Sequence, residues 1–315
     1  MNVNTAIATT ATAENYRGRF APSPSGFLHL GSLLAATGSY LQARAHGGSW
    51  LVRIEDLDTP RIIPGAADQI LRTLEHFGFE WDGPVTRQSD RLDLYQSALD
   101  RLTEAGLVYP CSCTRQALAS HHSADPAEEN EDCFYPGTCR AGPRRADAPH
   151  ALRFRAAHGE VEFTDVLQGA YRQNVATTVG DFVVRRKDGV YAYQLAVVVD
   201  DGEQGITEVV RGCDLLSNTP RQILLRKALD LPLPRHVHLP LLVEADGRKL
   251  AKSRRSVPVA GSEATAQLHT ALVQLRQQPP AELARGHVRG LMTWAIAHWN
   301  LGPMRGLREI RVEAV

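Results

Sequence analysis

The chain contains no apolar run that approaches the length of a membrane-spanning helix. Its first sixteen residues contain neither Lys nor Arg and lack the apolar core of a secretory signal peptide. An excess of one charge is also absent, because 35 Lys and Arg balance 35 Asp and Glu. This balance excludes a chain-wide polycation, although a local basic face is possible. We therefore expect a cytoplasmic protein with no membrane partner and with a disordered tail over residues 1–16.

The few cysteines do not have the pattern of a disulfide framework. The chain has five cysteines, an odd number, and four of them gather between residues 111 and 139. The sequence shows no internal repeat. Its 315 residues, 43% apolar and 22% charged, are ordinary for a globular protein and suffice for one large or two modest domains.

Residues 18–58 have the pattern of one β–loop–α–β unit. Residues 18–21 predict a first strand, and a turn rich in Pro, Ser and Gly leads from it into a helix that ends at two glycines. Residues 49–54 form an apolar run typical of a buried parallel strand, and Glu55, Asp56 and Asp58 follow it. The polar residues thus lie at the carboxyl ends of both strands, where open parallel sheets bind ligands.

This unit predicts nucleotide binding without a Walker loop. A turn that leads into a helix N-terminus presents free backbone N–H groups and the positive end of the helix dipole, which suits a phosphate. His29 lies where the helix begins and could donate a hydrogen bond to a phosphoryl oxygen, and Gly31 leaves room for a base or ribose. The alternative is that His29 and Gly31 only cap and pack the helix.

Two strings carry a resemblance to a known family. RFAPSPSGFLHLGS, at residues 19–32, resembles the HIGH motif of class I aminoacyl-tRNA synthetases in the form used by the glutamyl branch, with Ser32 in place of the second His. KLAKS, at residues 249–253, resembles the KMSKS loop, with Leu250 and Ala251 as departures. The resemblance implies that ATP is bound by His29, Gly31, Ser32 and Lys252, and that His29, Lys252 and Lys249 are catalytic.

The resemblance also implies a pocket for L-glutamate, formed by Arg19, Phe20, Ala21, Pro22, Ser23, Glu55, Tyr193 and Arg211. A guanidinium binds a carboxylate as a fork, so Arg19 and Arg211 are the candidates for the two carboxylates of glutamate, and which takes which stays open. Tyr193 adds a hydroxyl, and Glu55 is placed to accept the ammonium group. The alternatives are a packed tyrosine, an exposed arginine and a surface acid.

The later part of the chain predicts further strands and helices. Residues 190–193 predict a strand that ends at Tyr193, and residues 194–199 continue it toward Asp200 and Asp201. Residues 89–105 predict a helix capped by Ser89, and residues 214–229 predict another. Residues 265–310 read as amphipathic helices, including the string MRGLREI.

The clustered cysteines predict a zinc site. Cys111 and Cys113 form a CxC pair, and Cys139 follows later, a set that suits tetrahedral zinc. Cys133 would complete an all-thiolate site, and His121 and His122 are weaker candidates. The family resemblance points instead to Tyr135, four residues before Cys139. The implied ligands of one structural Zn2+ are therefore Cys111, Cys113, Tyr135 and Cys139, and the alternative is a set of unrelated thiols.

The resemblance is greatest to glutamyl-queuosine tRNA(Asp) synthetases, paralogues of glutamyl-tRNA synthetase that lack the anticodon-binding domain. It implies an α/β fold, namely a Rossmann-like, parallel-sheet class I catalytic domain with an inserted zinc-binding subdomain and a C-terminal helical region. The expected divisions are a tail at 1–16, the first catalytic half at 17–110, the zinc insertion at 111–150, the second half with an acceptor-type insert at 151–230, and the KMSKS-like loop and helical region at 231–315.

The implied activity has two steps. ATP, with Mg2+, would activate L-glutamate to glutamyl-adenylate, and the glutamyl group would pass to the queuosine base in the anticodon loop of tRNA(Asp), without charging of tRNA(Glu). We expect a monomer. The rival interpretations are a shortened glutamyl-tRNA synthetase that charges a tRNA 3′ end, and a non-catalytic RNA-binding paralogue.

Overall fold

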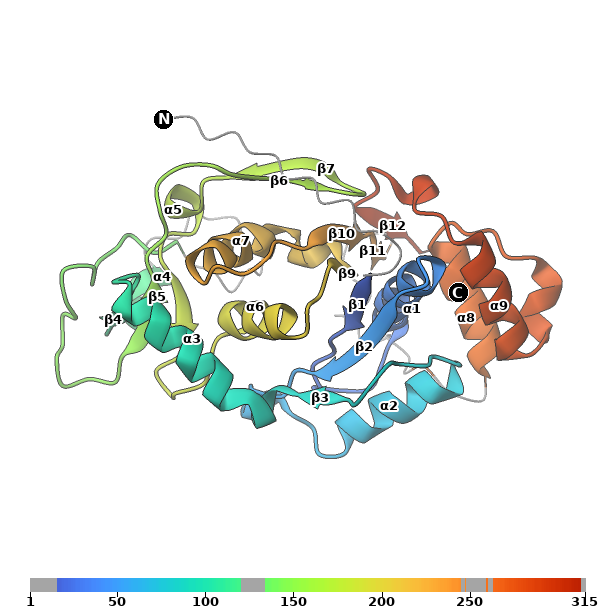
Figure 1. The fold of residues 1–315 in the computed structure, drawn as a ribbon, viewed down its shortest axis with the longest axis horizontal. Helices are drawn as coiled ribbons and strands as arrows, with labels where there is room; N and C mark the ends of the chain where they lie inside the picture. The colour runs from blue at the N-terminus through green and yellow to red at the C-terminus, as the bar shows by residue number, and fades with distance from the viewer. Residues whose placement is uncertain (1–15, 120–133, 245–246, 248–258, 260–262, 313–315) are drawn as a thin grey trace.

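A parallel sheet forms the centre of the fold (Figure 1). The computed structural model describes residues 16–119, 134–244, 247, 259 and 263–312. Within them, β2 (Ser49–Ile54) pairs in parallel with β1 (Arg17–Phe20) on one side and with β3 (Thr86–Arg87) on the other. The predicted first strand and the predicted strand at 49–54 are confirmed.

The second half of the chain forms a four-stranded sheet beside the first. β9 (Glu208–Gly212) and β6 (Val161–Asp165) flank β10 (Arg235–Leu239) in parallel, and β7 (Gly169–Gln173) closes the edge antiparallel to β6. β9 lies beside β1, since the N–H of Thr207 donates to the carbonyl of Arg17 at 2.9 Å. Residues about 190 positions apart therefore lie side by side, and the carboxyl ends of β1, β2 and β9 face the same region.

A smaller antiparallel sheet carries the cysteine segment. Its order is β4 (Val108–Cys111), β5 (Ala151–Phe154) and β8 (Phe182–Arg185). The helices α3 (Leu92–Glu104) and α4 (Arg115–Ala119) flank β4 in the chain.

The remaining helices pack around these sheets and at the C-terminal end (Figure 1). They are α1 (Leu30–Ala45), α2 (Ala66–His76), α5 (Val175–Thr178), α6 (Tyr193–Glu203), α7 (Thr219–Ala228), α8 (Ala264–Gln274) and α9 (Val288–His298). Within the described residues, short 3-10 helices occur at Thr59–Arg61, Gln88–Arg91, Cys213–Asn218, Ala281–Arg285 and Gly302–Met304. A two-stranded parallel pair, β11 (Leu241–Val243) and β12 (Glu309–Arg311), joins the C-terminal region to the rest. In the part of the chain described, no helix is both long and apolar enough to cross a membrane.

Two hydrophobic clusters hold these layers together. Trp50 is fully buried in the larger one, where the rings of Phe20, Tyr40 and Phe79 pack around it and its Nε1 donates to Ser39 at 3.0 Å. The smaller cluster lies between α3, α6, α7 and the antiparallel sheet. Burial of aromatic side chains of this size is a dominant stabilising contribution.

Several sequence-based predictions are wrong in detail. Residues 194–199 are not a strand but the core of α6, because their apolar run is short enough to fit either element and tertiary packing decides between them. The helix predicted over residues 214–229 is present, but in two parts, a 3-10 helix at Cys213–Asn218 and then α7, with Pro220 at the start of α7. The string MRGLREI contains no α-helix and ends in β12.

Two further predictions, one at the start of α3 and one in the N-terminal tail, also differ from the structure. Ser89 lies inside a 3-10 helix and does not cap α3, because its N–H and hydroxyl both donate to Asp56 at 2.8 Å. Tyr16, placed in the tail by its sequence, is only 3% exposed and stacks on His46 with ring centroids 5.1 Å apart. Residues 1–15 lie outside the described part of the chain.

Candidate active site

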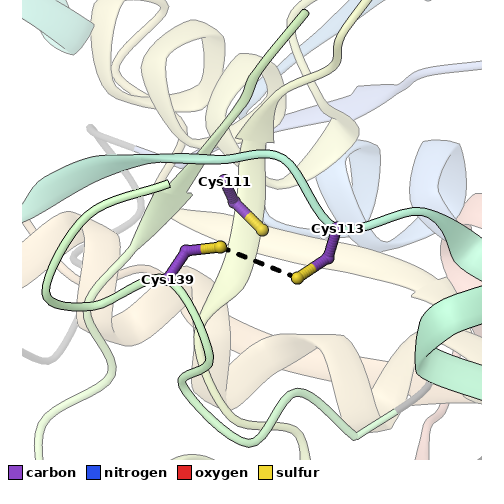
Figure 2. A group of neighbouring side chains, drawn as sticks. All are labelled: Cys111, Cys113 and Cys139. Carbon is purple, nitrogen blue, oxygen red and sulfur yellow. Dashed lines mark hydrogen bonds between the residues drawn. The ribbon is translucent and has the colours of Figure 1, made fainter. Parts of the chain in front are cut away.

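The three described cysteines of the 111–139 segment converge, as Figure 2 shows. Cys111 ends β4, Cys113 follows it, and Cys139 lies in the turn after Tyr135. Their Sγ atoms all lie within 4.8 Å of one another, and the Sγ atoms of Cys113 and Cys139 are 3.7 Å apart. Three soft sulfur donors at this spacing fit a zinc ion.

The Tyr135 hydroxyl is directed toward this cluster. It accepts hydrogen bonds from the N–H of Cys139 at 2.8 Å and from the thiol of Cys111 at 3.4 Å, and the ring is buried. The guanidinium of Arg153 lies 3.8 Å from the ring centroid. The position of Tyr135 fits a fourth ligand, whereas Cys133, His121 and His122 lie outside the described residues.

The cluster is electrostatically suited to a cation. Burial alone would raise the pKa of Cys139, but backbone N–H groups of Arg144 and Ser112 and its other neighbours lower it to about 6. Burial and the contact with Cys139 raise the pKa of Cys113 to about 11. One thiol of the group is thus already favoured as the thiolate, the form that binds metal.

The turn after β1 leads directly into the N-terminus of α1. His29 is the N-cap of α1, and its Nδ1 accepts a hydrogen bond from the N–H of Ser32 at 3.2 Å. Because Nδ1 accepts, the proton of the neutral ring is on Nε2, which lies 3.2 Å from the Ser32 hydroxyl. The capping role weighed as an alternative for His29 is therefore real, and the Nε2–H has the Ser32 hydroxyl as its partner in this structure.

Gly31 lies directly beside the His29 ring. A Cβ on Gly31 would lie 3.1 Å from Cε1 of the His29 ring. Burial lowers the pKa of His29, and the charge of Asp214 partly offsets this effect. Asp214 follows β9, so the His29 turn and the carboxyl end of β9 are electrostatic neighbours.

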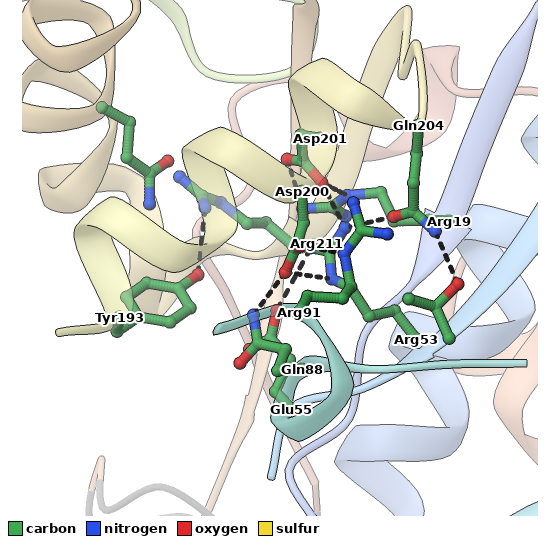
Figure 3. Close-up of polar contacts among 12 residues, drawn as sticks. Arg19, Arg53, Glu55, Gln88, Arg91, Tyr193, Asp200, Asp201, Gln204 and Arg211 are labelled. Atoms are coloured by element: carbon green, nitrogen blue, oxygen red, sulfur yellow. Dashed lines mark hydrogen bonds and ion pairs between the residues drawn. The ribbon is translucent and has the colours of Figure 1, made fainter. Parts of the chain in front are cut away.

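Arg19 lies in a buried ionic network, shown in Figure 3. Its Nε donates to Asp201 at 3.0 Å, and its Nη1 donates to the carbonyl of Val210 at 3.4 Å. Arg53 also binds Asp201, at 2.8 Å, and the side chains of Arg53 and Asp201 are 0% and 5% exposed. Burial opposes ionisation of Asp201, but Arg19, Arg53 and Arg226 keep its pKa below the ordinary value.

Glu55 directly follows the carboxyl end of β2 and contacts this network. Its Oε1 accepts from Arg53 at 3.2 Å, and its N–H donates to the carbonyl of Pro22 at 3.0 Å. Burial raises the pKa of Glu55, while Arg53 and Arg19 oppose the increase. Asp56 and Asp58 face elsewhere, since Asp56 binds Ser89 and Asp58 binds Arg186 at 2.8 Å.

Arg211 and Tyr193 are joined on the other side of the site, as the dashed line between them in Figure 3 shows. Nη1 of Arg211 donates to the Tyr193 hydroxyl at 3.3 Å. Arg211 is 6% exposed, and among the described residues it makes no ion pair with a carboxylate. Burial raises the pKa of Tyr193, and the charges of Arg211, Glu55 and Arg19 all act on it, so these four residues share one region.

The other predicted pocket residues contribute mainly backbone. The Phe20 ring belongs to the core around Trp50, Ala21 and Pro22 are half-buried, and Ser23 is exposed. Lys249 and Lys252 lie outside the described residues, so their placement stays a prediction.

Comparisons with known proteins place the chain in a family. The model of the family described as class I tRNA synthetases (E and Q), catalytic domain, matches residues 15–275. A protein of Pseudomonas fluorescens named glutamyl-Q tRNA(Asp) synthetase is 52% identical over 293 residues, which cover 93% of this chain and 94% of that protein. One of the same name from Aromatoleum aromaticum is 51% identical over 96% of this chain and 94% of its own length.

The chain belongs to the glutamyl-Q tRNA(Asp) synthetase family. Among solved structures, a glutamate tRNA ligase from Elizabethkingia meningosepticum, in complex with its amino acid, is similar with a TM-score of 0.76 at 26% identity. The similarity covers 94% of this chain and 67% of that one. The predicted class I synthetase fold and its family are therefore confirmed.

Sequence reasoning about this family member missed the buried residues that form the hydrogen-bonded and ionic networks around Arg19 and Arg211. These are Arg53, Asp165, Asp200, Asp201 and His238. A signal existed, because Arg53 interrupts the apolar strand 49–54 and two aspartates follow the apolar run 194–199. Charged residues inside apolar segments are almost never fully buried unless they are paired.

Proposed function

We propose that this chain activates L-glutamate with ATP and transfers the glutamyl group to the queuosine base in the anticodon loop of tRNA(Asp). The observation that carries the proposal is the arrangement of Arg211 and Tyr193 beside Glu55 and the His29 turn. A buried guanidinium without an acidic partner among the described residues suits an anionic substrate.

The two arginines differ in what they can still bind. Arg19 is already neutralised by Asp201, whereas Arg211 carries an uncompensated charge within the described part of the chain. We therefore assign the side-chain carboxylate of glutamate to Arg211 and Tyr193. Glu55 accepts the ammonium group, and its partners Arg53 and Arg19 keep it from being an isolated buried charge.

Activation follows from this placement. An oxygen of the α-carboxylate attacks the α-phosphorus of ATP, the bond to the bridging oxygen of the β-phosphate breaks, and pyrophosphate leaves. The attacking carboxylate is already ionised, so no general base is required. Charge that develops on the phosphates is stabilised by the Nε2–H of His29, by the N-terminus of α1 and by Lys252, with ATP entering as its magnesium complex.

Zinc has a structural role in this proposal. Cys111, Cys113, Cys139 and Tyr135 would hold it, and it would fix the end of β4 to the Cys139 turn. Four protein ligands leave no open position, which is typical of a structural site. We further propose the five divisions given above, a monomer and a cytoplasmic location.

The site of attachment tests the function. Purified chain is incubated with radiolabelled glutamate, ATP and tRNA(Asp) that carries queuosine, and nuclease mapping then locates the label. We expect label in the anticodon-loop fragment, and none on tRNA(Glu). Label at the 3′ end of any tRNA would refute the queuosine assignment in favour of a shortened glutamyl-tRNA synthetase.

A further inference from the structure

We propose that His238 and Asp165 are positioning residues that hold the guanidinium of Arg211 with one edge directed at the substrate carboxylate. This inference rests on the function proposed above, because it assigns Arg211 to the carboxylate. Neither His238 nor Asp165 is expected to touch the substrate, since the side chains of both are 0% exposed.

A continuous chain of contacts joins the three residues. Nδ1 of His238 lies 2.6 Å from Oδ2 of Asp165, and the Nε–H of Arg211 donates to Nε2 of His238 at 3.1 Å. Asp165 ends β6, His238 lies in β10, and Arg211 lies in β9. The contacts therefore run across three adjacent strands of the four-stranded sheet toward the pocket.

The arginine fixes the protonation of the histidine. A guanidinium can only donate, so Nε2 of His238 must be the acceptor and Nδ1 must carry the proton that is donated to Asp165. His238 is therefore neutral and in a single tautomer, and it adds no negative charge beside Arg211. The arginine is oriented without being neutralised, which a carboxylate in direct contact could not achieve.

Asp165 is itself held firmly. Its Oδ1 accepts from the N–H groups of Leu167 at 3.0 Å and Gln168 at 2.9 Å, and from the N–H of His238 at 3.3 Å. These bonds satisfy the carboxylate oxygen that does not face the His238 ring. The orientation of the His238 ring is thus set by backbone groups of β10 and of the turn after β6.

The remaining N–H groups of Arg211 are almost all occupied. Nη2 donates to Thr219 at 2.8 Å and to the carbonyl of Leu215 at 3.2 Å, and Nη1 donates to Tyr193. Together with the bond from Nε to His238, the described residues use four of the five N–H groups present in arginine, which leaves one on Nη1 without a partner among them. The free donor lies on the same edge as the Tyr193 hydroxyl, where a carboxylate would complete the set.

Two substitutions of His238 each keep one of the two hydrogen bonds of the ring and remove the other. The amide oxygen of His238→Gln can take the place of Nε2 and accept from Arg211, whereas the amide NH2 of His238→Asn can take the place of Nδ1 and donate to Asp165. His236→Gln is the matched control, because His236 is also buried in β10 but does not bond to Arg211. Glutamate-dependent ATP–pyrophosphate exchange is measured for each variant, together with its melting temperature.

We expect His238→Asn to raise KM for glutamate about tenfold or more, the usual cost of one hydrogen bond to a charged group. KM for ATP should stay near the wild-type value, and His238→Gln and His236→Gln should keep most of the glutamate affinity. If His238→Asn keeps wild-type KM for glutamate, or if KM for both substrates rises equally in both His238 variants, the positioning role is refuted. A wild-type protein without glutamate-dependent exchange would instead refute the proposed function itself.

Discussion

At the scale of single residues, Gly31 and His29 fit closely together in the turn to which we assign the phosphates of ATP. A methyl group on Gly31 would lie 3.1 Å from Cε1 of the imidazole, closer than such contacts normally are. We expect Gly31→Ala to turn the His29 ring away from its capping position and to raise KM for ATP several-fold, about the effect of one lost hydrogen bond. Steady-state exchange kinetics with ATP as the varied substrate measure this effect.

Gly26 provides the matched control for that substitution. It lies in the same turn, and a Cβ built on it meets no atom within 4 Å. Gly26→Ala should therefore keep wild-type KM for ATP. Equal kinetics for the two alanine variants would show that the contact between residue 31 and the His29 ring has no role in ATP binding.

At the scale of elements, Asp201 joins α6 to two strands. It accepts from Arg19 on β1 and from Arg53 on β2, and all three side chains are buried. Asp201→Asn would leave the buried guanidinium of Arg19 without its counter-charge, at a cost of about 3–5 kcal/mol, whereas Arg53 would keep Glu55 and Asp200. We expect a clear loss of free energy of unfolding in urea titrations, whereas Glu203→Gln, on the exposed side of the same helix, should change it little. Comparable losses in both would contradict this account.

The segment between β4 and β5 is expected to depend on its metal. Cys139→Ser should lose bound zinc because one of three clustered thiols is removed, and Tyr135→Phe should lose it in part because the hydroxyl beside Cys111 is missing. Metal content per chain by atomic spectroscopy measures both. Cys213→Ser, which removes a cysteine outside the cluster, is the control. Full retention by both test variants would rule out the proposed ligands, and retention by Tyr135→Phe alone would favour Cys133.

The helices and strands also show which parts of the fold can be predicted from the local sequence. The strand at 49–54 and the helix after the His29 turn can be predicted from local sequence. An apolar run indicates the strand, and two glycines mark the end of the helix, so neither depends on the rest of the chain. The run 194–199 is ambiguous by the same rule, and only its packing against α3 and α7 makes it a helix. Partners such as His238 could not be predicted, because they are determined by the order of strands β6, β10 and β9, which no local pattern encodes.

At the scale of the whole molecule, three buried aspartates join distant parts of the chain. Asp165 links β6 to β10, Asp201 links α6 to β1 and β2, and Asp181 links the antiparallel sheet to Arg140 beside the cysteine cluster, at 2.6 Å. Burial opposes the charge of each, but hydrogen bonds and cationic neighbours keep all three pKa values below the ordinary value. Each carboxylate therefore stabilises the folded state in its ionised form.

The sign of the resulting pH dependence follows from linkage. An aspartate with a lowered folded-state pKa contributes its full stability above the unfolded-state pKa, about 3.9, and loses it as the pH falls further. The melting temperature of the wild type should therefore fall steeply below about pH 4. Asp201→Asn lacks one of these groups, so the difference in melting temperature between it and the wild type should be largest near neutral pH and shrink in acid. A difference that stays constant down to about pH 2 would mean that ionised Asp201 contributes nothing to the stability of the fold.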